Sequence, residues 1–153
     1  MATIAEMLRR AKSVNRVSIR KMTAEIISEK HQDFEQKQRD QMLLGLDNKG
    51  RKIGYYSTQA YSSRKYSMNS KAGYGVVDLK FKGDFQDEIT ARVVSANRFI
   101  MYSQDWKMKK LTDIEKGYGP DIFGFNDTSK KEITSEIVMP ALVFKIKNVL
   151  LRV

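Results

Sequence analysis

The order of structural elements in this chain is most readily seen around residues 76–85, whose sequence is VVDLKFKGDF. Residues 76–81 are predicted to form a strand that ends at Gly83. Asp84 is expected to cap a short helical turn that runs through Glu88, because its carboxylate can accept a free backbone N–H. None of these side chains has an obvious chemical role, so this stretch indicates an architecture and not an activity.

A hairpin and a helix are predicted after this stretch. Residues 89–94 and 99–102 have the composition of strands, and the turn between them is rich in small and polar residues. Asp105 is expected to cap a helix that runs to about Lys116. The sequence GYGP at residues 117–120 then stops this helix.

The last predicted helix begins at a capping box formed by Ser129 and Glu132. It has a strong apolar face, made by Ile133, Ile137, Val138, Leu142, Val143, Ile146, Val149 and Leu150. Pro140 should kink this helix, unless it lies in the first turn of a new helical segment.

The N-terminal part is also predicted to be helical. Thr3 and Glu6 form a capping box, and the first helix is expected to break between Ser13 and Asn15. A longer helix is predicted over residues 18–44. Its apolar stripe is thin and consists of Ile19, Met22, Ile26, Ile27 and Phe34. Such a stripe is typical of a helix that projects from the molecule or packs on a neighbouring subunit.

Residues 51–75 are rich in Tyr, Ser, Lys and Gly and are predicted to form a long ordered loop with a short helix at 59–66. Loops of this length are usually functional. The elements together predict an α+β fold with long N-terminal helices, a small antiparallel sheet and a long C-terminal helix. We expect one domain over residues 1–153, with a helical part at 1–44 and an α+β core at 45–153.

The charge of the chain is positive and uneven. The net charge is +10, and residues 1–72 contain 15 Lys and Arg against 7 Asp and Glu, whereas residues 73–153 contain 13 against 11. This pattern is consistent with a nearby polyanion such as DNA, and equally with a solvated surface. The candidate DNA-facing residues are Arg9, Arg10, Arg16, Arg20 and Lys21.

The composition also bears on the cellular compartment. The chain has no cysteine, which excludes disulfides and cysteine metal sites and fits a protein that folds in a reducing cytoplasm. The first ten residues lack the continuous apolar core of a signal peptide. No apolar run approaches the roughly 18 residues needed to cross a bilayer, so we expect no membrane association.

Few residues suggest chemistry. His31 is the only histidine, and we expect it to face solvent, so it has no partners for catalysis or metal binding. Asp84, Asp87 and Glu88 could share a helical face and hold a divalent cation. Acidic residues are also favoured in the first turn of any helix, which is the preferred explanation. No phosphate-binding loop is present. We therefore expect no enzymatic activity, no metal site and no cofactor.

Basic and aromatic residues alternate within residues 51–75. Such a mixture can bind single-stranded nucleic acid, with rings stacked on bases and cations on phosphates. Tyr and Arg are also enriched at protein interfaces, and no nucleic-acid-binding module surrounds this segment. We therefore favour an oligomer or partner interface, with Tyr55, Tyr56, Tyr61, Arg64, Lys65 and Tyr66 as its candidate residues.

From about Gly45 to Leu150 the sequence resembles the tail-completion and neck proteins of tailed bacteriophages, which include the head–tail joining and virion-morphogenesis families. Tyr61 and Lys65 match the loop of that family. The remaining matches are LKFKGDF at 79–85, YSQD at 102–105 and YGPDIFGFN at 118–126. Two departures occur: Lys82 stands where the family usually has Thr, and no Arg follows Pro120. Ring proteins of crAss-like phages contain similar sequences.

This resemblance implies a virion protein that is made in the host cytoplasm and has no catalytic role. Such subunits form a homo-oligomeric ring, often of twelve or six copies, at the head–tail connector or upper tail. The ring extends the channel for the packaged DNA, which it contacts without sequence specificity. It also docks the neighbouring neck, portal or tail proteins. The alternative function is that of a small basic DNA-binding protein, whose affinity would fall steeply with salt.

Overall fold

Three helices begin the chain in a computed structural model that describes residues 3–80, 84–96 and 98–151. They are α1 (Ile4–Ser13), α2 (Arg16–Glu29) and α3 (His31–Leu43). The predicted capping box of α1 is confirmed, since the Glu6 N–H donates to Thr3 Oγ1 at 3.3 Å and the Thr3 N–H donates to Glu6 Oε2 at 2.8 Å. The predicted break before α2 is also confirmed, because Asn15 caps that helix.

The continuous helix predicted over residues 18–44 is wrong, because the chain bends at Lys30. The backbone angles of Lys30 are −111° for φ and 23° for ψ, which lie outside the helical range. This bend lets α2 pack on α8 (Met139–Leu151) while α3 packs on β1 (Ile89–Ser95). α2 also reaches β1, so the hairpin is contacted by both helices on either side of the bend.

The C-terminal helix consists of three consecutive segments: α7 (Asp127–Glu132), the π-helical segment η2 (Ile133–Val138) and α8. The capping box predicted at Ser129 is wrong, since the Ser129 N–H donates to Asn126 Oδ1 at 2.9 Å and Asn126 is the cap. Before Pro140, the Met139 N–H bonds the carbonyl of Thr134, five residues earlier. The wider π-turn relieves the clash that a proline ring makes with the preceding helical turn.

The predicted hairpin is confirmed as a two-stranded antiparallel sheet of β1 and β2 (Arg98–Ser103). Its register pairs Ile89 with Ser103 and Val93 with Phe99, and an irregularity follows Val93. The strand predicted over residues 76–81 is wrong within its described part. Val76 forms only an isolated bridge with Tyr55, and Leu79 has a φ of 54°, in the left-handed region that strands do not use.

Three further helices lie between α3 and α7 in the chain. The predicted short helix is confirmed as α4 (Gln59–Met68). α5 (Asp84–Asp87) includes Asp84 and so does not start after it as predicted. The helix predicted from Asp105 to Lys116 is much shorter, because α6 spans Met108–Leu111 and a turn follows. A single 3-10 turn, η1 (Pro120–Ile122), then leads towards α7.

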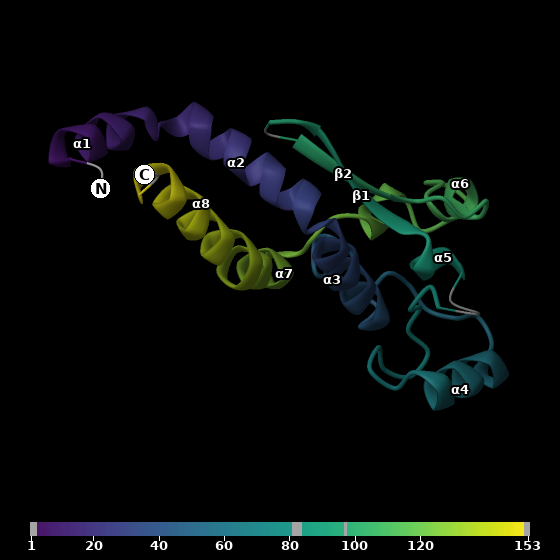
Figure 1. The fold of residues 1–153 in the computed structure, drawn as a ribbon. Coiled ribbons are helices and arrows are strands. Elements are labelled where there is room, and N and C mark those ends of the chain that lie inside the picture. Colours follow the sequence, from purple (N-terminus) through teal and green to yellow (C-terminus); the bar gives the residue numbers. More distant parts are fainter. Residues whose placement is uncertain (1–2, 81–83, 97, 152–153) are drawn as a thin grey trace.

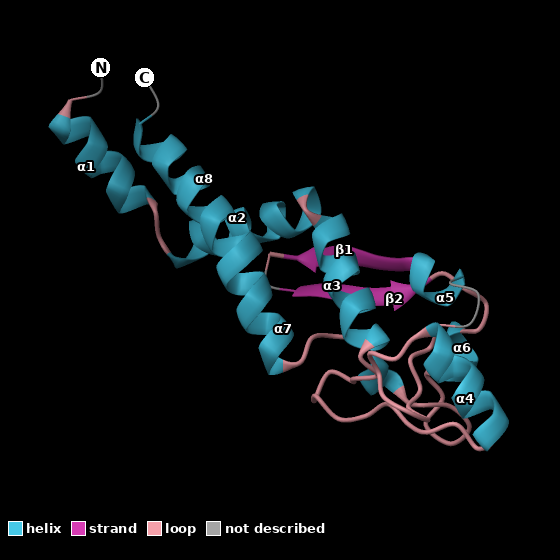
Figure 2. Cartoon of the chain, turned by 90° about the horizontal axis from the view of Figure 1, so that it is seen from below, coloured by secondary structure: helices cyan, strands magenta, loops and turns pink. Residues whose placement is uncertain are grey.

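The molecule is an α+β fold with two small hydrophobic clusters. One contains Phe34, Ala91, Phe125 and Ile133, and the other contains Met42, Phe85, Ile89 and Ile122. Both clusters lie between α3, the sheet and the loops that follow it. Figures 1 and 2 show that α1, α2 and α8 extend away from this body and lie beside one another, with the two chain ends at the tip. We call these three helices the arm.

Candidate functional site

A buried ionic cluster holds the segment of residues 51–75, here called the Tyr-rich segment. Lys65 Nζ lies 2.6 Å from Asp78 Oδ1, and the side chains of both residues are almost fully enclosed. Tyr56 donates its hydroxyl to Asp78 Oδ1 at 3.0 Å, and Asn69 donates to Oδ2 at 2.9 Å. Lys65 also donates to the backbone carbonyl of Lys80. These bonds tie α4 and the surrounding loop to Asp78 and Lys80.

The environment of this cluster sets the protonation of its members. Burial would raise the pKa of Asp78, but hydrogen bonds from Lys65 and Asn69 outweigh it and hold that pKa below its ordinary value. Burial, helped by the negative charge of Asp78, raises the pKa of the Tyr56 hydroxyl well above its usual range. The cluster is therefore a charged carboxylate–ammonium pair with a neutral tyrosine, which is a structural arrangement.

The structure separates the candidate interface residues of the Tyr-rich segment into two groups. Tyr55, Arg64 and Tyr66 are exposed, and Tyr66 stacks edge-on against Tyr74. The other members point inward. The rings of Tyr56 and Tyr61 meet edge to face at 4.8 Å, and Lys65 is only 4% exposed. A partner that binds this surface would therefore contact Tyr55, Arg64 and Tyr66.

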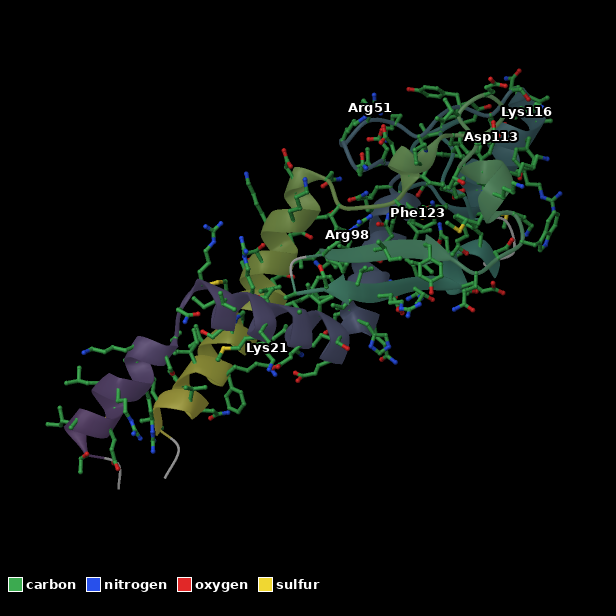
Figure 3. All side chains as sticks on the ribbon, turned by 90° about the horizontal axis from the view of Figure 1, so that it is seen from above. Lys21, Arg51, Arg98, Asp113, Lys116 and Phe123 are labelled. Carbon is green, nitrogen blue, oxygen red and sulfur yellow. The ribbon has the colours of Figure 1, made fainter. Side chains whose placement is uncertain are left out.

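The candidate DNA-facing residues all lie on the arm. Arg9, Arg16, Arg20 and Lys21 are exposed on α1 and α2. Arg10 is half-buried and donates to the backbone carbonyl of Leu150 at 3.4 Å, which attaches α1 to the end of α8. Figures 1 and 3 place the arm and the Tyr-rich segment at opposite ends of the molecule, so the structure does not bring the two candidate sets together.

Several large apolar side chains of the arm are left uncovered by the rest of the chain. Neither α1 nor α8 contains a buried residue. On the arm, the most exposed of the large apolar side chains are Ile4 at 78%, Leu8 at 59%, Val17 at 74%, Phe144 at 65% and Leu151 at 59%. The sequence predicted a strong apolar face on the C-terminal helix, without a prediction of what covers it. Periodicity identifies the apolar residues of a helix, but it does not show which of them the fold leaves exposed.

Two ion-pair sets hold the C-terminal helix to the N-terminal helices. Lys145 on α8 contacts Glu29 at 2.7 Å and Glu25 at 3.3 Å, both on α2. The hydrogen bond that Lys145 donates to Glu29 raises the pKa of Lys145. Lys37 on α3 contacts Glu132 at 3.0 Å and Glu136 at 3.1 Å. The glutamate side chains of these pairs are 46–61% exposed and the lysine side chains 22–25%, so each pair should add only modest stability.

An apolar groove of about 590 Å³ opens where the arm meets the body. Its floor is formed by Phe34, Phe99 and Phe125 from the first hydrophobic cluster, and Lys130 lies at its edge. A second hollow of about 230 Å³ shares Thr23, Ile27 and Phe99 with it. The first core cluster is thus partly open to solvent.

Metal binding and membrane insertion find no support within the described residues. No group of three His, Asp or Glu side chains among them is arranged to hold a metal ion. His31 is half-buried, and its Nδ1 lies 3.0 Å from the carbonyl of Ser28. No described helix is both long enough and apolar enough to cross a bilayer.

The chain matches no protein-family model, no curated protein and no solved structure.

Proposed function

We propose that this protein is a structural subunit of a tailed-phage virion that assembles with copies of itself into a ring in the neck, head–tail connector or upper tail. The ring extends the DNA channel and offers a docking surface to the next component. Two things support this proposal: the sequence resemblance over residues 45–150, and the arm. It requires no catalytic residue, metal or cofactor.

The arm is the observation that carries the proposal. Burying a Leu or Phe side chain stabilises a protein by about 1.5–3 kcal/mol, and soluble monomers rarely leave several such side chains uncovered on adjacent helices. Covering Leu8 and Phe144 with a neighbouring subunit would recover this free energy. A projecting arm that packs on the next copy is a simple way to build a closed ring, because each copy then uses two different surfaces.

The test is the size of the purified protein, measured by light scattering after gel filtration and by negative-stain electron microscopy. We expect rings from the wild-type protein. Leu8→Asp combined with Phe144→Asp should give monomers, because each carboxylate would be buried without a partner. Ile114→Asp is the matched control, since Ile114 is 83% exposed but lies on the body. It should still form rings.

The assignment to a virion is tested separately by mass spectrometry of purified particles of the phage that encodes the chain. A monomeric protein that forms no rings and is absent from the particles would exclude the proposal. If the protein forms rings but is absent from the particles, the assignment to a virion is excluded while the homo-oligomeric ring remains supported. Loss of rings in the Ile114→Asp control would show that the arm is not the interface.

A second candidate function is non-specific binding to duplex DNA through the arm. The exposed Arg9, Arg16 and Arg20 support it, because each can neutralise a phosphate. The logarithm of the affinity should then fall with the logarithm of the salt concentration. The combined change of Arg9 and Arg16 to Ala should reduce that slope by about 1.8, or 0.9 for each lost phosphate contact.

A further inference from the structure

The turn around α6 displays the only tryptophan of the chain to solvent. Trp106 is 82% exposed, although tryptophan is usually mostly buried. Its neighbour Asp105 is 6% exposed and anchors the turn, since Asp105 Oδ1 accepts the Lys107 N–H at 2.6 Å and the Asp105 N–H donates to Ser103 Oγ at 3.2 Å. The exposed ring is therefore carried by a backbone that is fixed to the end of β2.

The helix that follows presents two lysines beside this ring. Met108 and Leu111 of α6 pack on the second hydrophobic cluster. Lys109 and Lys110 lie between them in sequence and are exposed. Because residues three apart share a helical face, burial of the first pair turns the lysines outward. The Lys107 ammonium adds a cation 5.6 Å from the centre of the Trp106 ring.

A tight turn brings one more lysine to the same place. Asp113 Oδ1 accepts the N–H groups of Glu115 at 2.8 Å and Lys116 at 2.7 Å. Gly117 then passes so close to α6 that a Cβ atom there would lie 2.3 Å from the carbonyl oxygen of Lys110. Any larger residue would push the turn away. The glycine thus lets Lys116 lie beside the lysines of α6.

These residues enclose a shallow hollow of about 330 Å³ that is lined by Trp106, Lys109, Lys110, Asp113 and Lys116. Figure 3 shows Asp113 and Lys116 at the end of the molecule opposite the arm, far from Lys21. The hollow is therefore distinct from the basic residues of the arm.

We propose that this hollow binds single-stranded nucleic acid, with one base stacked on Trp106 and the adjacent phosphates held by Lys109, Lys110 and Lys116. An exposed aromatic ring beside several cations is the combination that such strands require. The negative charge of Asp113 disfavours a ligand that consists of phosphate alone, because the two anions repel each other. Its carboxylate can instead accept a hydrogen bond from the exocyclic amino group of a base, which favours cytosine or adenine over thymine.

The site does not depend on the proposed ring, because Trp106 and the arm lie at different ends of the molecule. A neck subunit with such a site could hold a strand end of packaged DNA, and a protein outside the virion could use it equally. The two proposals therefore fail independently. Failure of ring formation leaves the strand-binding site intact, and loss of strand binding leaves the ring intact.

The experiment uses the full chain and the fluorescence of Trp106, which is the only tryptophan signal. A short single-stranded oligodeoxycytidylate should quench this emission in a saturable way. The same sequence as a duplex, inorganic tripolyphosphate and the mononucleotide serve as separate probes. We expect little quenching by the duplex and by tripolyphosphate. Quenching by the mononucleotide as tight as by the strand would contradict the proposal and indicate a nucleotide site.

Variants identify the residues, with binding measured by the anisotropy of a labelled oligodeoxycytidylate. Trp106→Ala should weaken binding about tenfold, and Trp106→Phe, which keeps a stacking ring, should stay within about threefold of wild type. Replacing Lys109 and Lys110 by Ala should reduce the slope of log affinity against log salt by about 1.4. Replacing the exposed Lys130 and Lys131 of α7 is the matched control and should leave the slope nearly unchanged.

Three results would overturn the proposal. One is Trp106→Ala binding the strand as well as wild type while its circular dichroism shows the same fold. Another is an equal loss of salt dependence in the control pair, which would mean that charge anywhere on the surface suffices. The third is an emission shift with vesicles rich in phosphatidylserine and none with the strand, which would assign the Trp106 surface to a membrane.

Discussion

At the scale of single residues, the buried pair of Lys65 and Asp78 is the strongest constraint on the loop region. Burying this pair costs much free energy of desolvation, because two charges leave water. Their mutual attraction and several hydrogen bonds compensate for that cost. The left-handed backbone of Leu79, with its φ of 54°, directly follows Asp78. Residues 76–79 therefore serve as an anchor for the loop and not as a strand.

Loss of either partner of this pair should be strongly destabilising. Lys65→Met or Asp78→Asn should each lower the free energy of unfolding by about 3–5 kcal/mol, because the remaining group is buried without its counter-charge. Urea denaturation followed by circular dichroism measures this. Asp127→Asn is the control, since that carboxylate pairs with Lys130 but is 92% exposed, and its cost should be below about 1 kcal/mol. Similar small costs at all three positions would contradict the burial of the pair.

The same pair should make stability depend on acid pH. Since the pKa of Asp78 is lower in the folded protein than in the unfolded chain, its contribution is fully present above the unfolded value of about 3.9. It is lost as the pH falls through the lower, folded value. The stability difference between wild type and Asp78→Asn should therefore shrink below about pH 4. Urea midpoints of both proteins at several pH values test this, and a constant difference down to pH 2 would refute it.

At the scale of elements, the helix ends show where local signals compete. Asn126 and Ser129 both have side chains that cap helices, and they are three residues apart. Asn126 is buried, and its backbone N–H donates to Gln41 Oε1 at 2.9 Å. This tertiary contact holds Asn126 in the extended conformation that a cap needs, so the helix starts there.

Removal of this cap should destabilise the C-terminal helix. Asn126→Ala should lower the free energy of unfolding by about 1 kcal/mol, because the Ser129 N–H loses its acceptor. Thermal unfolding followed by circular dichroism is the measurement. Asn148→Ala is the matched control, since Asn148 is exposed within α8 and alanine favours a helix interior. It should have no effect or a slightly stabilising one. If both variants lose equal stability, Asn126 is not the cap.

At the scale of the whole molecule, the arm and the body differ in how they are stabilised. The body contains both hydrophobic clusters, whereas α1 has no buried residue and is attached through its contacts with α8. Regions with few buried contacts open most readily. The arm is therefore the part whose order should depend most on neighbouring copies.

Amide hydrogen exchange should detect this difference. In a monomeric preparation, the amides of α1 should exchange much faster than those of α3, which contributes Phe34 and Met42 to the clusters. In assembled protein, α1 should become protected while α3 changes little. Mass spectrometry of peptide fragments measures both states. Equal protection of α1 and α3 in the monomer would show that the arm is stable by itself.

Much of the local structure could be predicted from the sequence. The first capping box at Thr3, the break before Asn15, the helix at residues 59–66 and the hairpin all depend on residues close together in the chain, and all are confirmed. The candidate site could be predicted only in part from the sequence. Patterns identified basic and aromatic residues, but they could not show that Lys65 is enclosed while Trp106 is exposed.

The sequence by itself therefore determined the α+β class, the identity of most elements and the strongly positive charge, because these follow from local periodicity, capping and composition. Only the tertiary structure decided the bend at Lys30, the cap at Asn126 and the burial of Lys65 with Asp78. It also decided which apolar helix faces stay uncovered on the arm. Each of these outcomes depends on contacts between residues far apart in the chain, and no local pattern contains them.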